Sequence, residues 1–164
     1  MNKTTLTHFN SQGKAKMVDI GQKETTSRTA KATGTISMQE NTLNLIKSQQ
    51  IIKGDVFTVA KTAAILACKN TPNLIPMCHP IRITHIDLNF EINESDSCVK
   101  AIAKVSAHDK TGAEMEALTA VSISLLTIYD MCKAADKKMI ISNIHLKEKT
   151  GGKSGNFLFE ERLP

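Results

Sequence analysis

Two charged side chains near the end of a long apolar stretch have the types and spacing needed for proton transfer. Asp130 and Lys133 lie three residues apart, a spacing at which side chains on a helix can touch. Spacing alone favours an exposed ion pair, which contributes only a few tenths of a kcal/mol to stability. The neighbours Tyr129, Met131 and Cys132 instead indicate partial burial, which would leave both charged groups ready to exchange protons.

A second set of acidic residues begins the same predicted helix. Glu114 and Glu116 flank Met115, and the helix dipole favours acids in a first turn, so stabilisation of the helix start is one explanation. Two carboxylates at this place could instead accept hydrogen bonds from the donor edge of a guanine-like base. Glu116 and Asp130 would lie about 21 Å apart at 1.5 Å per residue. Because a small substrate cannot easily reach both, we predict a two-fold interface of antiparallel helices that carries the active sites.

His79 is the candidate reactive residue of a proline-rich loop. It lies between Cys78 and Pro80, and Pro76 helps to stiffen the segment, which favours a positioned side chain. A lone histidine is nevertheless more often structural. A Cys78–His79 nucleophile pair is not expected, because adjacent residues on an extended segment point apart.

Two further segments could bind anions. Lys53-Gly54-Asp55 precedes a predicted helix, where it could be a turn with a helix cap or a site that joins backbone N–H groups, the helix dipole and Lys53. The run from Gly151 to Gly155 looks like the end of a phosphate-binding loop, but Lys147 stands where such a loop requires its first glycine. It could be a solvated tail or a segment that closes over phosphate.

These residues need a scaffold of alternating strands and helices. Hydrophobic periodicity predicts the order β-α-α-β-β-α-β, which is an α+β fold with a ferredoxin-like antiparallel sheet and helices packed on one face. We expect a flexible N-terminal arm over 1–33, a single α+β domain over 34–149 and a flexible C-terminal tail over 150–164. The predicted strands are 34–38, 81–92 with a bulge near Thr84 and His85, 98–105 and 139–146, and the predicted helices are 40–50, 56–69 and 111–134.

The composition of the chain favours some classes of protein function and argues against others. The chain has 164 residues, which favours one domain, and its net charge of +5 favours anionic partners. Aromatic residues make up only 4%, which argues against stacking platforms for single-stranded nucleic acid. The four cysteines match no zinc module, so we expect free thiols, no bound metal and a cytoplasmic protein. We expect no membrane span, because no uninterrupted apolar run approaches the ~20 residues required.

Six ordered motifs resemble one enzyme family, the cyclic pyranopterin monophosphate synthases, over almost the whole chain. These enzymes act in molybdenum cofactor biosynthesis after the radical GTP cyclase. The resemblance implies a lyase that converts the 3′,8-cyclised GTP intermediate into cyclic pyranopterin monophosphate with release of pyrophosphate. The motifs that carry it are Met17–Ile20, Lys53–Val56, Leu74–Pro80, Lys110–Ala120, Leu126–Ala134 and Gly151–Gly155.

The resemblance also implies roles for individual residues. Asp130 and Lys133 are similar to the family's acid/base pair, and Lys53 to a second catalytic or phosphate-binding lysine. It implies no required cofactor, with Mg²⁺ left as an option that the triphosphate brings, and a homohexamer built as a trimer of dimers with sites at dimer interfaces. The residues implied to contact the substrate are Met77, Cys78, His79, Glu114, Met115, Glu116, Arg28 and Lys153.

One other class of protein stays open at this stage. A non-enzymatic basic oligomer that binds nucleotides or RNA would also carry a positive charge. Such a module should tolerate Asp130→Asn and lose affinity when lysines are changed, whereas an enzyme should still bind and fail to turn over. The scarcity of aromatic residues favours the enzyme, so we expect a nucleotide-derived small molecule as the partner and neither nucleic acid nor membrane.

Overall fold

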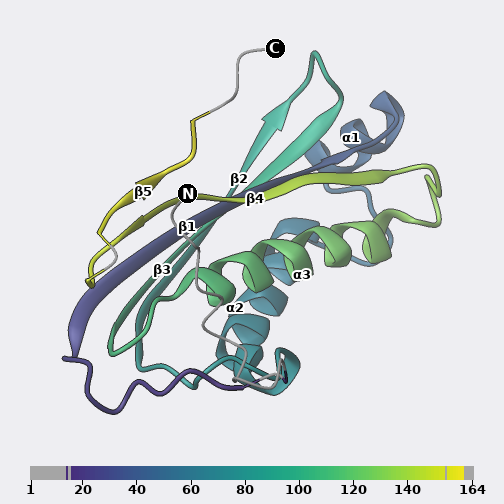
Figure 1. The fold of residues 1–164 in the computed structure, drawn as a ribbon. Helices are drawn as coiled ribbons and strands as arrows, with labels where there is room; N and C mark the ends of the chain where they lie inside the picture. The colour runs from purple at the N-terminus through teal and green to yellow at the C-terminus, as the bar shows by residue number, and fades with distance from the viewer. Residues whose placement is uncertain (1–13, 15, 154, 161–164) are drawn as a thin grey trace.

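A five-stranded antiparallel sheet with helices on one face forms the protein (Figure 1). The computed structural model describes residues 14, 16–153 and 155–160. Along the sheet the strands follow the order β2-β3-β1-β4-β5, which confirms the predicted α+β class and the ferredoxin-like arrangement of its first four strands. The elements are β1 Thr26–Ser37, α1 Glu40–Lys47, α2 Val56–Leu74, β2 Ile83–Asn93, β3 Cys98–Asp109, α3 Glu114–Cys132, β4 Ile140–Thr150 and β5 Phe157–Leu158.

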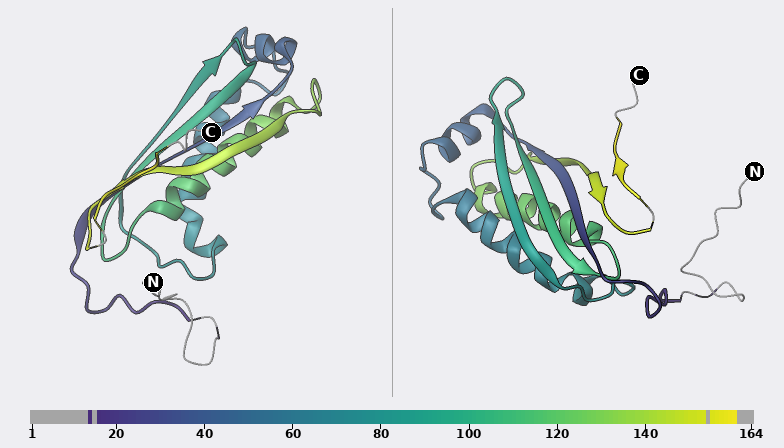
Figure 2. Two further views of the ribbon diagram at one scale, coloured as in Figure 1. Left: turned by 45° about the horizontal axis from the view of Figure 1, so that its top comes forward. Right: turned by 90° about the vertical axis from the view of Figure 1, so that its left-hand side faces the viewer.

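The two long helices cover one face of the sheet and leave the other open, as Figure 2 shows from two further sides. Helices α2 and α3 lie side by side on that face, α3 against β1, β3 and β4 and α2 against β2, and most of the apolar side chains of α3 are buried. By length and composition α3 could cross a membrane, so the expectation that no segment meets that criterion was wrong. However, 56% of its apolar window is buried inside the protein, which identifies α3 as the central core helix.

Strand β1 is longer than its sequence predicts. It begins at Thr26 rather than near Gly34, so the proposed arm over 1–33 overlaps the central strand of the sheet. Its inward positions include Ala30, Ala32 and Gly34, all buried, and such small residues are poor signals for a strand. Residues 1–13 and 15 of the proposed arm lie outside the described residues.

Small residues on the sheet let α3 approach closely. A Cβ atom added to Gly34 would lie 2.9 Å from side-chain carbons of Val121 and Leu125 on α3 and of Ile144 on β4. The neighbouring strand β3 presents Ala101 and Ala103 beside it, both fully buried. At this contact, Val121 and Leu125 of α3 therefore pack closely against small residues of β1 and β3.

Gly34→Ala should therefore destabilise the protein. The added methyl group overpacks the contact between β1 and α3, and we expect a loss of about 1–3 kcal/mol in the free energy of unfolding. Chemical denaturation of the variant and the unchanged protein measures this directly. An unchanged midpoint with an unchanged slope would show that the sheet and α3 can separate at no cost.

Helix α2 begins as predicted and ends later. Asp55 caps it by accepting hydrogen bonds from the backbone N–H groups of Phe57 and Thr58, both at 3.1 Å. The helix runs through Pro72 to Leu74, so the predicted end at Lys69 was wrong. Pro72 lies in the last turn, where its missing N–H removes a single backbone bond near the helix end.

The remaining differences concern the ends of strands. A register shift between Ile83 and His85 confirms the predicted bulge in β2. Strand β4 reaches Thr150, and β5 then pairs antiparallel with it. Part of the segment over 150–164 that we expected to be a tail is therefore in the sheet, while Ser154 and residues 161–164 lie outside the described residues.

Candidate functional site

Three charged side chains meet at the C-terminal end of α3. Lys53 donates hydrogen bonds to the Asp130 carboxylate at 2.8 Å and to the Asp130 carbonyl oxygen at 2.9 Å. Lys133 donates to the other carboxylate oxygen at 2.6 Å, which confirms the contact predicted from their spacing. The carbonyl oxygen belongs to the unsatisfied last turn of the helix, where a cation is favoured. We call these three residues the acid/base cluster.

The cluster holds opposite charges in fixed places. Hydrogen bonds from Lys133 and then Lys53 lower the pKa of Asp130 to about 2, and the Asp130 carboxylate raises the pKa of Lys133. At neutral pH the cluster therefore presents one carboxylate, able to accept a proton, beside an ammonium able to donate one. These hydrogen bonds keep both groups charged and in fixed positions at neutral pH.

The acid/base cluster is open to solvent in the single chain. The side chains of Asp130 and Lys133 are 55% and 52% exposed in the single chain, which is less burial than their apolar neighbours predicted. The two residues close the last turn of α3 beyond the edge of the core, although Met131 and Cys132 between them are buried. Exposed ion pairs contribute little to stability, so folding alone does not account for gathering three such groups.

The other end of α3 borders a cavity of about 430 Å³. Met77, Cys78 and His79 line it from the loop after α2, and Glu114, Met115 and Glu116 line it from the first turn of α3. Val18 and Ile20 of the N-terminal segment complete its apolar wall. We call this the α3 N-terminal cavity. It brings together all six residues for which the family resemblance implied substrate contact through these two motifs.

The two glutamates of this cavity have different environments. Glu114 forms an ion pair with Lys149 of β4 at 2.9 Å, and Gly112 lies against its carboxylate where a larger residue would displace it. Glu116 is only 2% exposed. Burial, followed by the nearby Glu114 charge, raises the pKa of Glu116 to about 7, although its own backbone N–H acts in the opposite direction.

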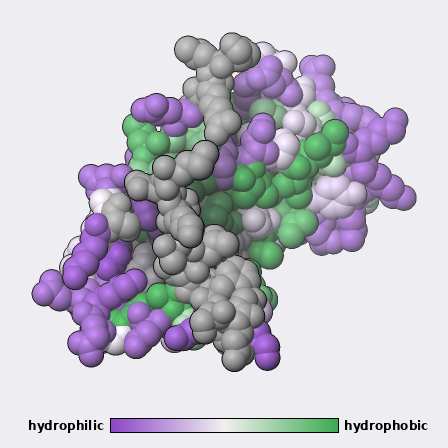
Figure 3. Space-filling model, in the orientation of Figure 1, coloured by the Kyte–Doolittle hydropathy of each residue, from purple (hydrophilic) through white to green (hydrophobic). Residues whose placement is uncertain are grey.

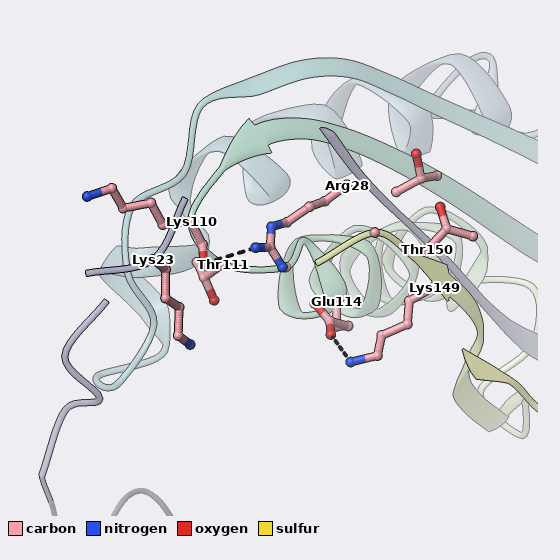
Figure 4. Close-up of a pocket in the computed structure, with 10 residues that line it drawn as sticks. Lys23, Arg28, Lys110, Thr111, Glu114, Lys149 and Thr150 are labelled. Carbon is pink, nitrogen blue, oxygen red and sulfur yellow. Dashed lines mark hydrogen bonds and ion pairs between the residues drawn. The ribbon is translucent and has the colours of Figure 1, made fainter. Parts of the chain in front are cut away.

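A second cavity beside the first is lined by basic side chains (Figure 4). Lys23 of the N-terminal segment, Arg28 of β1 and Lys149 of β4 line it, with Glu114 paired to Lys149. Lys110 of the β3–α3 loop also borders it, but its amine points away from the cavity and binds the Gly21 carbonyl oxygen. The volume of this cavity is about 140 Å³, and we call it the basic cavity. Lys23, Arg28 and Lys149 bring three cations and one paired carboxylate to this small polar cavity, which favours a ligand with phosphate oxygens.

Arg28 is held in place by the backbone around it. Its guanidinium donates to the carbonyl oxygens of Asp109 at 2.9 Å and Lys110 at 3.2 Å. Gly152 lies directly over that guanidinium, since a Cβ there would lie 2.1 Å from an Arg28 nitrogen. Lys153 lines an adjoining cavity with Lys23 and Arg28. The glycine run therefore packs against Arg28 at the edge of these cavities, and the substrate contacts of Arg28 and Lys153 stay predictions.

Three of the basic residues have no signal in the sequence that points to a binding role. Lys23 lies in the predicted N-terminal arm, and Lys149 follows the predicted last strand without a role of its own. Lys110 is only the first residue of a family motif. Lys110 donates to the carbonyl oxygen of Gly21 at 2.7 Å, which fastens the segment that carries Lys23. Only the antiparallel pairing of β4 with β1 brings Lys149 to Arg28, and such a long-range contact leaves no local signal in the sequence.

One chain does not bring all the predicted residues together. Helices α2 and α3 run in opposite directions, so Lys53 before α2 meets Asp130 at one end, while His79 after α2 meets Glu116 at the other. The acid/base cluster and the α3 N-terminal cavity are therefore separated by the length of α3, about 21 Å between Glu116 and Asp130 at 1.5 Å per residue. Among the described residues, no group of His, Cys, Asp or Glu side chains is suited to hold a metal ion.

The cysteines play no part in a disulfide. All four are free, and Cys68 and Cys132 are buried. Burial raises the pKa of Cys68 to about 12 and that of Cys132 to about 11, so both stay protonated and unreactive. The prediction of free thiols is confirmed.

Comparison with known proteins gives one consistent result. The model of the MoaC family matches residues 17–152. A cyclic pyranopterin monophosphate synthase of Desulfitobacterium hafniense is 57% identical over 159 residues, which covers 96% of each chain. Proteins of the same name are 56% identical in Clostridium perfringens, over 94% of this chain and 98% of the relative, and in Limosilactobacillus fermentum, over 95% and 94%. All six motifs lie at least partly within the matched range.

Proposed function

The chain belongs to the MoaC family, and from that premise we propose that it is a cyclic pyranopterin monophosphate synthase of molybdenum cofactor biosynthesis. It converts the 3′,8-cyclised GTP intermediate into cyclic pyranopterin monophosphate and releases pyrophosphate. The observation that carries this proposal is the hydrogen-bonded cluster of Lys53, Asp130 and Lys133. This cluster supplies one carboxylate that accepts hydrogen bonds from two lysine amines.

The acid/base cluster and the basic cavity serve different parts of the reaction. Rearranging the base and sugar requires proton transfers and no change of oxidation state. Asp130 accepts protons in these steps and Lys133 donates them, while Lys53 orients the carboxylate. Closing the cyclic phosphate expels pyrophosphate, and the cations of the basic cavity stabilise the negative charge that collects on that leaving group. The protein needs no cofactor of its own for these steps, and Mg²⁺ is an option that the triphosphate brings.

The active site is built from two chains. The outward face of α3 carries exposed Met115 and Leu126, and β4 adds exposed Ile140 and Ile144. Figure 3 shows hydrophobic surface gathered over this side of the molecule. Burying that surface against a second copy would be favourable, and antiparallel α3 helices would bring the acid/base cluster of one chain over the cavity of the other.

This arrangement supports sites at the interfaces of a dimer. Association would also cover Asp130 and Lys133, whose exposure in one chain is otherwise unexplained. Exclusion of water strengthens electrostatic interactions inside such a site. A trimer of these dimers gives the hexamer expected from the family resemblance, and the assembly acts in the cytoplasm.

Incubation of the purified protein with the cyclised GTP intermediate tests the function directly. We expect both cyclic pyranopterin monophosphate and pyrophosphate, in equal amounts. Lys133→Ala should fold, bind the intermediate and give little product. A well-folded protein that binds the intermediate and forms no product would contradict the proposal and favour a nucleotide-binding module.

A further inference from the structure

Asp109 is a carboxylate at the end of β3 whose two oxygens both bind the backbone. One oxygen accepts a hydrogen bond from the backbone N–H of Arg82 at 2.8 Å, and the other accepts one from the backbone N–H of Lys110 at 2.7 Å. The backbone N–H of His108 donates in turn to the carbonyl oxygen of Arg82 at 3.1 Å. Asp109 stands directly before the motif Lys110–Ala120, so the family resemblance implies no role for it.

The peptide unit that Asp109 fixes is one of the two that hold Arg28. The Nε–H of Arg28 donates to the carbonyl oxygen of Asp109 at 2.9 Å, and its Nη2 donates to that of Lys110 at 3.2 Å (Figure 4). The Asp109 carbonyl and the Lys110 N–H belong to the same planar peptide unit. The hydrogen bond between that N–H and the Asp109 carboxylate therefore sets the direction in which the carbonyl oxygen meets the guanidinium.

The direction of the Arg28 guanidinium decides what a ligand meets. Arg28 lines both the basic cavity and the adjoining cavity that contains Lys153. A guanidinium has five N–H donors in a rigid plane, and the two backbone bonds occupy two of them. Because the plane is rigid, fixing one edge also fixes the directions of the remaining donors. The orientation of the loop at Asp109 is thus transmitted to the cavities.

By its charge alone Asp109 opposes the binding of an anion. Burial raises the pKa of Asp109, but the hydrogen bonds from the Arg82 and Lys110 N–H groups and the nearby charges of Arg82 and Arg28 hold it below its ordinary value. Asp109 is therefore negative at neutral pH. A negative charge near a phosphate site weakens the binding of phosphate by repulsion. The geometry that the carboxylate imposes explains its place better than its charge does.

We propose that Asp109 is a positioning residue that orients the Arg28 guanidinium toward phosphate groups of the ligand. It acts through the peptide unit that it shares with Lys110, and it does not itself line the basic cavity. The inference rests on the proposed function for the identity of the ligand, which supplies pyrophosphate as the leaving group. The hydrogen bonds that carry the inference do not depend on that function.

Two substitutions at position 109 separate orientation from charge. Asp109→Asn keeps the size and removes the charge, and its amide nitrogen cannot accept a hydrogen bond from a backbone N–H. Asp109→Glu keeps the charge and moves the carboxylate by one methylene group. Glu91→Gln, on an exposed position of β2, removes the same charge elsewhere and is the control. If Asp109 acted only through its charge, pyrophosphate would bind more tightly to Asp109→Asn and equally well to Asp109→Glu.

Calorimetric titration with pyrophosphate at constant ionic strength measures the effect. Asp109→Asn should bind about 5- to 10-fold more weakly than the unchanged protein, because a misdirected guanidinium loses part of a charge-assisted hydrogen bond. Asp109→Glu should also bind more weakly, and Glu91→Gln should bind equally well. When Arg28→Ala is already present, Asp109→Asn should cause no further loss, since no guanidinium is left to orient.

Steady-state kinetics with the cyclised GTP intermediate gives an independent measurement. The KM of Asp109→Asn should rise by a similar factor, and kcat should stay within about twofold because the acid/base cluster is unchanged. A purely structural role would lower stability and leave the affinity and KM of the folded molecules as they are. If Asp109→Asn does not fold, Asp109→Glu with and without Arg28→Ala decides the question in the same way.

Three results would overturn the proposal. They are pyrophosphate binding by Asp109→Asn that equals or exceeds that of the unchanged protein, equal losses with and without Arg28, and an unchanged protein that does not bind pyrophosphate. If the unchanged protein then still forms cyclic pyranopterin monophosphate, the proposed function stands without this role for Asp109. Coupling of Asp109 to Arg28 in pyrophosphate binding without any product would reject the function and keep the positioning role.

Discussion

Asp130→Asn should lower kcat for cyclic pyranopterin monophosphate by about 10²- to 10⁴-fold, the usual contribution of a positioned acid/base group. The amide keeps the size of the side chain and removes the negative charge that Lys53 and Lys133 both contact. Steady-state rates with the cyclised GTP intermediate measure the effect. Because these side chains are about half exposed, the free energy of unfolding should change little.

The matched control for this variant is Glu94→Gln. Glu94 is also an exposed carboxylate in an ion pair with a lysine, Lys47, and it lies in the turn between β2 and β3. It should keep full activity. A comparable loss in both variants would mean that removing any surface charge affects turnover, and retention of activity by Asp130→Asn would remove Asp130 from the mechanism.

Lys23→Ala should lower kcat/KM for the same substrate by about 10- to 100-fold, mostly through KM, as expected for one charge-assisted hydrogen bond of about 1.5–3 kcal/mol. Lys23 lines the basic cavity, and among the described residues no side chain pairs with its amine. Its positive charge is therefore available to a phosphate group. Lys110 anchors the adjoining backbone at Gly21, so the substitution should leave the segment in place.

Titration with pyrophosphate provides a second measurement on the same variant. Lys23→Ala should bind pyrophosphate more weakly and with a smaller dependence on salt concentration. Lys104→Ala, on the exposed face of β3, is the control and should behave like the unchanged protein. Equal affinities in all three proteins would show that the basic cavity does not hold the leaving group.

The sequence predicted those parts of the fold that have strong local signals. The apolar run of α3, the Asp55 cap of α2 and the bulge of β2 near His85 were all recognised correctly. The first half of β1 was not predicted because its inward residues, Ala30 and Ala32, are alanines, which favour a strand only when a helix packs on them. The end of α2 was predicted too early, at Lys69, because Pro72 suggested a loop. The helix continues through Pro72 to Leu74, since a proline in the last turn removes only one backbone hydrogen bond.

In the candidate site, too, the sequence predicts contacts between residues close in the chain but not contacts between distant elements. The contact between Asp130 and Lys133 followed from their spacing on one helix. Lys53 joins them only because α2 and α3 are antiparallel neighbours, and Lys149 reaches Glu114 only through the pairing of β4 with β1. The exposure of Asp130 was not predicted, because its sequence neighbours are buried on the other side of the helix.

A mixture of two defective chains tests the central claim, that each active site takes its acid/base cluster from one chain and its cavities from another. Asp130→Asn and Lys23→Ala are each nearly inactive at low substrate concentration, and they are dissociated together and allowed to reassemble. Random pairing makes half of the dimers mixed, and each mixed dimer has one intact site of two, so about a quarter of full activity should return. Activity that stays at the average of the two separate variants would show that each site lies within one chain.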